Sequence, residues 1–253
     1  MISFDRLVNW VKLVPTKIEM MLPKKFIKRE FCLGKKKKKE LYVLFPHWWS
    51  TYKTTVFIKH NILSAGYSYL GYELPGGILS GDAGKTLKSF LDINQDATRY
   101  LKKLAKKHKF SKINVVGVSL GGVNACMLTN NNRLVDTVDL IAPGNCLAEA
   151  MWKGGRTQWL RKKYEKKGVS LKKLKEAWSE IAPENNLGGF GGKRVCVKLS
   201  KADEVVPYSC GKSLVKKMRA CGIKPLVETN DVLGHYITAF KFYLDPWDII
   251  PPK

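Results

Sequence analysis

The stretch Gly117-Val118-Ser119-Leu120-Gly121-Gly122 decides the fold of this 253-residue chain. It overlaps the end of 113–118, a short run rich in β-branched residues, which predicts a strand buried on both faces of a parallel sheet. Residues 120–128 then predict a helix. A G-x-S-x-G sequence between a strand and a helix is typical of a nucleophile elbow, a turn so sharp that positions 117 and 121 must be glycine. The turn presents the Ser119 hydroxyl at the carboxyl end of the sheet, near a helix N-terminus.

A serine hydroxyl is a weak nucleophile until a base removes its proton, so a histidine must lie beside Ser119. The chain has four histidines. Two of them, His60 and His108, fall within or at the end of predicted helices and are expected to be exposed bystanders. His47 follows a predicted strand and is expected to shape the pocket. His235, just before the last predicted helix, is the candidate base because it comes last in the chain order serine, acid, histidine.

The carboxylate that orients this base is expected between Ser119 and His235. Asp203 begins a loop just past a predicted strand, where its side chain can face the site and accept the Nδ1 proton of the histidine. Glu204 is adjacent and would point elsewhere if Asp203 points in. The other acids considered are Asp139, inside a predicted strand, and Asp231, expected to cap or turn the chain. Asp203 is therefore the candidate acid.

The remaining sequence predicts strands that alternate with helices. The first two strands flank a tight basic turn at 34–39 and predict a hairpin, because glycine permits the turn and its lysines stay solvated. The alternation farther along the chain implies a mostly parallel sheet with helices on both faces. Strands are predicted at 26–33, 41–45, 67–72, 113–118, 138–141, 194–199 and 226–228, and helices at 51–63, 86–107, 120–128, 212–218 and 236–243.

Two segments stand apart from this alternation. Residues 26–253 are predicted to be one domain, and the second segment is an insertion within it. Residues 1–25 predict an amphipathic helical segment, which either packs on the domain or lies in a membrane interface. Residues 145–192 interleave aromatic side chains with many lysines and predict a helical cap insertion, which returns to the sheet through a glycine-rich run. We expect this cap to lie over Ser119. Its tryptophans, Trp152, Trp159 and Trp178, are candidate pocket residues.

The glycine-flanked Ser119, the 203–207 segment and Gly234-His235, in this order, resemble the α/β-hydrolase family. The resemblance covers about residues 26 to 245. It implies the α/β-hydrolase fold and an oxyanion hole, formed by the backbone N–H of Leu120 and by a second N–H from the loop 46–50. Many members of the family have His-Gly where this chain has His47-Trp48. Trp49 is the candidate second donor with Trp48 as the alternative, and either indole could instead form a wall of the acyl pocket.

The charge of the chain predicts attraction to anionic partners. Lysine and arginine number 45 against 21 aspartate and glutamate, a formal net charge of +24. With 37 lysines and only 8 arginines, the composition does not favour nucleic acid, whose phosphates and bases are read best by arginine. Peripheral contact with an anionic membrane is one alternative, and compositional bias without function is the other.

The cysteines and the hydropathy predict a cytoplasmic protein. The six cysteines include no C-x-x-C pair and no secretory signal precedes them, so reduced thiols without a metal site are expected. The chain has no apolar run long enough for a transmembrane helix.

These residues predict a serine hydrolase that cleaves a small-molecule carboxylic ester or thioester through an acyl-enzyme, with no cofactor and no metal. A serine nucleophile disfavours the related dehalogenases and epoxide hydrolases, which use aspartate at this position. A peptidase or an acyltransferase would use the same triad. The alternative from another class is a catalytically idle hydrolase fold that binds anionic membrane surfaces or nucleic acid through its lysines.

Overall fold

The computed structural model describes residues 27–34 and 39–244. The predicted amphipathic helical segment at 1–25 and the central lysines of the basic turn, 35–38, lie outside the described residues.

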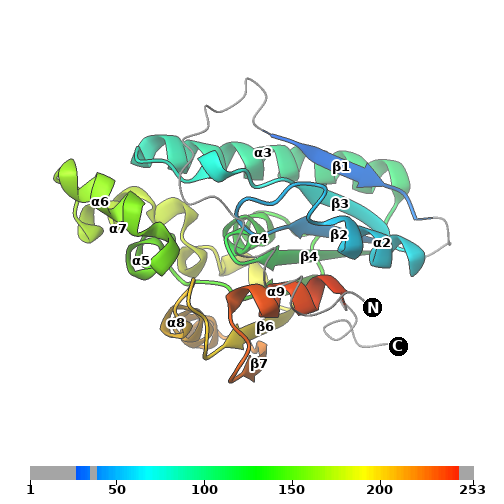
Figure 1. Cartoon of the computed structure of the whole chain (residues 1–253). Coiled ribbons are helices and arrows are strands. Elements are labelled where there is room, and N and C mark those ends of the chain that lie inside the picture. Colours follow the sequence, from blue (N-terminus) through cyan, green and yellow to red (C-terminus); the bar gives the residue numbers. More distant parts are fainter. Residues whose placement is uncertain (1–26, 35–38, 245–253) are drawn as a thin grey trace.

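The described residues form one sheet of seven strands in the order β1-β3-β2-β4-β5-β6-β7 (Figure 1). Strand β1 is antiparallel to β3, and all other neighbouring pairs are parallel. The prediction of a mostly parallel sheet is therefore confirmed. The strands are β1 (Arg29–Cys32), β2 (Glu40–Phe45), β3 (Ser68–Tyr72), β4 (Lys112–Val118), β5 (Thr137–Ile141), β6 (Arg194–Ser200) and β7 (Leu226–Asn230).

The predicted hairpin between the first two strands is wrong. Strand β1 pairs with β3 at the edge of the sheet, and β2 lies on the other side of β3. The physical reason is burial: the described side chains of β2 from Leu41 to Phe45 are almost fully buried and need neighbours on both sides, whereas β1 is partly exposed and suits an edge. Gly34 packs directly on the entry to β3, where a Cβ atom would lie 2.5 Å from the carbonyl oxygen of Gly66.

Helices cover both faces of the sheet because successive strand residues point to opposite sides. In β2, Leu41, Val43 and Phe45 join the larger core, which holds α3, α4 and α8, whereas Tyr42 and Leu44 join the smaller core with α2 and α9 (Figure 1). These helices are α2 (Val56–Ser64), α3 (Ala83–His108), α4 (Gly121–Asn130), α8 (Tyr208–Ala220) and α9 (His235–Leu244).

The segment between β5 and β6 is helical, as predicted for the insertion at 145–192. It contains α5 (Leu147–Lys153), α6 (Gln158–Lys166) and α7 (Leu171–Ala177), together with short 3₁₀ turns η2 (Gly155–Thr157), η3 (Ser179–Ile181), η4 (Pro183–Asn185) and η5 (Gly188–Phe190). In Figure 1 these helices project from one end of the sheet, on the left, beside α4. We call this segment the cap. No helix in the described part of the chain is long and apolar enough to cross a bilayer.

Candidate active site

The turn between β4 and α4 holds Ser119 in a strained backbone conformation. Its φ of 53° lies in the left-handed region, which costs a non-glycine residue about 1 kcal/mol or more. The predicted need for two glycines is confirmed: a Cβ atom at Gly117 would lie 2.6 Å from the Cβ of Ala125, and one at Gly121 would lie 2.0 Å from the carbonyl oxygen of Phe45. Packing at these contacts leaves room only for glycine, and the tight turn places the buried Ser119 at the wall of a cavity.

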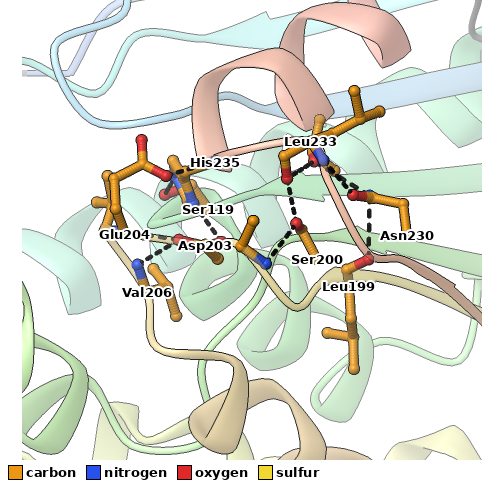
Figure 2. A network of polar contacts seen from close by, with 12 residues as sticks. Ser119, Leu199, Ser200, Asp203, Glu204, Val206, Asn230, Leu233 and His235 are labelled. Atoms are coloured by element: carbon orange, nitrogen blue, oxygen red, sulfur yellow. Dashed lines mark hydrogen bonds and ion pairs between the residues drawn. The ribbon is translucent and has the colours of Figure 1, made fainter.

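Ser119, His235 and Asp203 form a continuous chain of hydrogen bonds (Figure 2). The Ser119 Oγ lies 2.7 Å from the His235 Nε2, and the His235 Nδ1 lies 2.7 Å from the Asp203 Oδ2. Ser119 follows β4, Asp203 lies in the loop after β6, and His235 is the first residue of α9. The structure thus brings together the three residues selected from the sequence, and the side chains of Asp203 and His235 are each only 3% exposed.

The second oxygen of Asp203 is also held in place. Its Oδ1 accepts hydrogen bonds from the backbone N–H of Val205 at 2.9 Å and of Val206 at 2.7 Å. A carboxylate that accepts from two backbone donors and faces a histidine has little freedom to turn. This geometry leaves Oδ2 aimed at the imidazole ring.

The other acids considered from the sequence lie elsewhere. Glu204 accepts a hydrogen bond from the backbone N–H of His235 at 3.0 Å and so contacts the main chain rather than the ring. Asp231 pairs with Lys201 at the surface, with 68% of its side chain exposed. Asp139 is buried in β5, where burial raises its pKa to about 7 despite the nearby Arg194.

A second group of hydrogen bonds fixes the loop that carries His235, and it was not predicted from the sequence. The Ser200 hydroxyl donates to the carbonyl oxygen of Leu233, and Asn230 Oδ1 accepts from the Leu233 N–H at 2.9 Å (Figure 2). The Asn230 amide also donates to the Leu199 carbonyl oxygen at 3.2 Å. The sequence feature that could have predicted these contacts is the presence of short polar residues at the ends of β6 and β7. Such side chains commonly form hydrogen bonds with nearby backbone groups.

The loop that follows β2 begins beside the start of α4, where a Cβ atom at Gly121 would lie 2.5 Å from the carbonyl oxygen of Pro46. Within it, the N–H of His47 donates to the Tyr243 hydroxyl and the N–H of Ser50 donates to the His47 carbonyl oxygen. No hydrogen bond among the described residues occupies the N–H of Trp48 or Trp49. Trp49 has a φ of 67°, a second left-handed residue at this site.

No protein-family model and no curated protein matches the sequence. Among solved structures, Est1E from Butyrivibrio proteoclasticus with bound ferulic acid matches with a TM-score of 0.62 and 14% identity, over 91% of this chain and 97% of that one. Acetyl xylan esterase 1 from Thermoanaerobacterium matches with a TM-score of 0.60 and 14% identity, over 87% and 78%. Pyrococcus horikoshii acylaminoacyl peptidase has a TM-score of 0.67 and 12% identity, over 98% of this chain but 43% of that one.

This chain has the α/β-hydrolase fold. The fold expected from the resemblance is therefore confirmed.

In this α/β-hydrolase fold, a cavity of about 460 Å³ opens beside Ser119. Its walls come from the turn after β4, the loop after β2, the cap and the start of α9, and most of the lining side chains are apolar. The lining residues are His47, Trp48, Trp49, Thr54, Leu79, Ser119, Leu120, Val123, Gly144, Leu147, Ala150, Met151, Arg156, Thr157, Pro183, Val205, Val206, His235 and Tyr236. Such a cavity suits an apolar group held next to a few polar atoms.

The prediction that three cap tryptophans line the pocket is wrong. Trp178 is 1% exposed within the larger core, and its indole donates a hydrogen bond of 3.0 Å to the carbonyl oxygen of Ala83. Trp152 packs against the same core, and Trp159 is 39% exposed on the outside of α6. The amphipathic pattern of the segment indicated all three tryptophans as candidates. Whether such a residue lies in the core, on the surface or in the pocket depends on the direction of its side chain, which the pattern does not give. The cap instead contributes apolar residues such as Leu147 and Met151.

His47, Trp48 and Trp49 do line the cavity, as expected. The Nδ1 of His47 lies 2.8 Å from the Tyr243 hydroxyl. Burial and the neighbouring His235 lower the pKa of His47 to about 4, so this ring is neutral at neutral pH. The Trp48 indole donates to the carbonyl oxygen of Gly76 at 2.9 Å, which fixes it as a wall of the cavity.

Among the described residues, the site shows no arrangement for a metal ion, and no cysteine lines its cavity. No group of three or more His, Cys, Asp or Glu side chains in the described ranges is arranged to hold a metal ion. All six cysteines are free thiols. Cys126 behaves as a small apolar core residue, because burial raises its pKa to about 12.

Proposed function

We propose that this protein is a serine hydrolase that cleaves a carboxylic ester or thioester through an acyl-enzyme. The observation that carries the proposal is the hydrogen-bond chain from Ser119 through His235 to Asp203, with 2.7 Å at each step, beside an apolar cavity. A nucleophile, a base and a group that orients the base are the parts that acyl transfer to serine requires.

The mechanism follows from these positions. As the Ser119 Oγ attacks the ester carbon, the His235 Nε2 takes its proton, and Asp203 stabilises the imidazolium that forms. When the tetrahedral intermediate collapses, the same Nε2 gives the proton to the leaving alcohol or thiol. Water then enters, loses its proton to the His235 Nε2 and attacks the acyl carbon. When this second tetrahedral intermediate collapses, the Nε2 gives the proton to the Ser119 Oγ, which is released together with the carboxylic acid.

The backbone N–H groups of Leu120 and Trp49 are proposed as the oxyanion hole. Leu120 immediately precedes the first residue of α4, and the first N–H groups of a helix have no partner within it. In the loop after β2, the N–H groups of His47 and Ser50 are already engaged, which leaves Trp48 and Trp49. Each donor aimed at a developing oxyanion is typically worth about 3 kcal/mol of barrier.

The cavity favours an acyl group that is apolar. Leu79, Val123, Leu147 and Met151 line it, and about 460 Å³ exceeds what an acetyl group needs. Peptidase and acyltransferase activities use the same three side chains, and one of the similar structures is named as an acylaminoacyl peptidase. Rates for an ester, a thioester and an amide with one acyl group would rank these substrate classes, and we expect the amide to be slowest.

We propose peripheral contact with anionic membranes through the cap, and a cytoplasmic location. The outer surface of the cap has exposed lysines on α6 and α7 and the exposed Trp159, a combination suited to an interface with anionic lipid. Nucleic acid is not proposed as a partner. The free thiols are consistent with a reducing compartment.

The triad is tested by the rates of three variants with a chromogenic butyrate ester. We expect Ser119→Ala and His235→Ala each to lose at least about 10⁴-fold in kcat/KM, because the residues act as a unit. For the same reason the double variant should lose little more than either single variant. Losses that simply multiply, in variants that melt like the native protein, would contradict a shared mechanism.

A further inference from the structure

Arg156 lies in the short turn η2 of the cap, and this turn is fixed against the loop of the candidate acid. A Cβ atom at Gly154 would lie 2.7 Å from the carbonyl oxygen of Val205, two residues after Asp203. The buried hydroxyl of Thr157 donates to the carbonyl oxygens of Met151 and Gly154. These contacts hold the backbone on both sides of Arg156.

Arg156 supplies the only fixed charge in the cavity wall formed by the described residues. Its guanidinium carbon lies 5.1 Å from the ring centre of Tyr236, a cation–π contact that supports the side chain. No carboxylate of the described residues pairs with it. A guanidinium that stacks on a ring keeps the N–H groups along its edge available as donors. Two of these N–H groups can donate parallel hydrogen bonds to the two oxygens of a carboxylate.

The position of Arg156 also indicates which part of a substrate it faces. The Tyr236 ring contacts both residues: its centre lies 5.6 Å from the imidazole centre of His235 and 5.1 Å from the guanidinium carbon of Arg156. The leaving alcohol must take a proton from His235, so it lies on the histidine side of Ser119. Because Arg156 and His235 both contact Tyr236, we infer that the exposed Arg156 faces the leaving group rather than the acyl chain.

We propose that Arg156 binds an anionic group, a carboxylate, on the alcohol portion of the ester. This inference rests on the proposed hydrolase function, because it assigns a substrate class to that same site. The substrate class is then an apolar acyl group esterified to an alcohol that carries a negative charge.

The test uses two aryl butyrates that differ in charge, 4-carboxyphenyl butyrate and its carboxamide analogue. For each protein we take the ratio of kcat/KM for the carboxylate ester to kcat/KM for the carboxamide ester. The intrinsic difference in reactivity between the two esters is the same for every protein, so it cancels when the ratios are compared. We expect Arg156→Gln to lower this ratio about tenfold, and Arg156→Lys to lower it less, because lysine keeps the charge and loses the fork. Raising the salt concentration should lower the native ratio more steeply than the Arg156→Gln ratio, because the net positive charge of the chain remains in both proteins.

The matched control is Arg133→Gln, which removes the same charge from an exposed position between α4 and β5, at the opposite end of the strands. Its ratio should equal that of the native protein. An equal ratio in the native protein and Arg156→Gln would overturn the assignment, even though both remain active hydrolases. Failure of the native protein to hydrolyse either ester would instead contradict the hydrolase function, and with it this inference.

Discussion

The backbone N–H of His235 donates a hydrogen bond to the Oε2 of Glu204, while its ring contacts the neighbouring Asp203. Two adjacent carboxylates thus hold one histidine at two points, the first on its main chain and the second on its imidazole. The contact also explains Gly234, because a Cβ atom there would lie 2.8 Å from the same Glu204 oxygen.

Different roles for these carboxylates predict different losses. Asp203→Asn should lower kcat about 10³- to 10⁴-fold, because an amide neither stabilises the imidazolium nor enforces its tautomer. Glu204→Gln keeps an oxygen that accepts from the His235 N–H, so we expect a loss below about tenfold. The surface variant Asp231→Asn should match the native protein. Steady-state rates decide, and near-native activity of Asp203→Asn with a severe loss in either other variant would refute the acid assignment.

The glycines of the turn should differ sharply in their tolerance of alanine. At Gly121 a Cβ atom would lie 2.0 Å from the Phe45 carbonyl oxygen, whereas at Gly122 it would lie 3.4 Å from the Pro143 Cβ, an ordinary contact. We expect Gly121→Ala to lower the free energy of unfolding by about 3 kcal/mol and to displace the loop after β2. Gly122→Ala should change stability by less than about 1 kcal/mol. Urea unfolding measures both, and equal stabilities would contradict the packing described for the turn.

Asp139 should make the protein less stable as the pH rises from about 4 to 7. Burial raises its pKa in the folded protein to about 7, whereas an aspartate in the unfolded chain loses its proton near pH 4. Between these values only the folded state holds the proton, so raising the pH favours unfolding, by about 1.4 kcal/mol per unit. Above about pH 7 both states are ionised and the effect is constant.

The test is Asp139→Asn, with urea unfolding followed across this pH range. The variant should gain stability relative to the native protein by a few kcal/mol between pH 4 and 7, at about 1.4 kcal/mol per unit. Asp92→Asn, at a partly exposed carboxylate paired with Lys88, controls for the loss of one surface charge. If the native protein and Asp139→Asn show parallel pH profiles, Asp139 is ionised throughout the range.

The cap lysines should carry the proposed membrane contact. Replacement of Lys162, Lys166, Lys172 and Lys173 with glutamine should weaken binding to vesicles that contain phosphatidylserine by at least about tenfold. The same number of replacements on exposed α3, at Lys102, Lys103, Lys106 and Lys107, is the charge-matched control and should weaken binding less. Raising the salt from about 0.1 to about 1 M shortens the Debye length from about 10 to about 3 Å and should release the protein. If co-sedimentation with the vesicles does not depend on salt, or if both variants lose the same amount of binding, the cap lysines do not mediate membrane contact.

Local signals predicted which three side chains meet in the candidate site, because each of them lies in a short, recognisable segment. The turn around Ser119 requires glycine at two positions, and Asp203 and His235 each follow the end of a strand, where side chains of a parallel sheet converge. The alternation of strands and helices likewise predicted the parallel sheet. These features depend on spacing along the chain, which the sequence contains directly.

Long-range choices were not predictable in the same way. The pairing of β1 with β3 depends on which strand is buried on both sides, a property of the assembled sheet. Trp178 in the core and Trp159 on the surface belong to one amphipathic pattern, and neither lines the cavity. The cavity wall at Arg156 and the contact of Glu204 with His235 arise only when the cap and two loops meet.

The central claim is that Ser119 is a nucleophile activated by His235, and active-site labelling tests it most directly. The protein is treated with a fluorophosphonate probe, which forms a covalent bond with an activated serine, and the labelled peptide is identified by mass spectrometry. We predict one label on Ser119, no label in Ser119→Ala, and strongly reduced labelling in His235→Ala, while all three proteins melt alike. Labelling that persists undiminished in Ser119→Ala, or a folded native protein that takes up no label, would contradict the account.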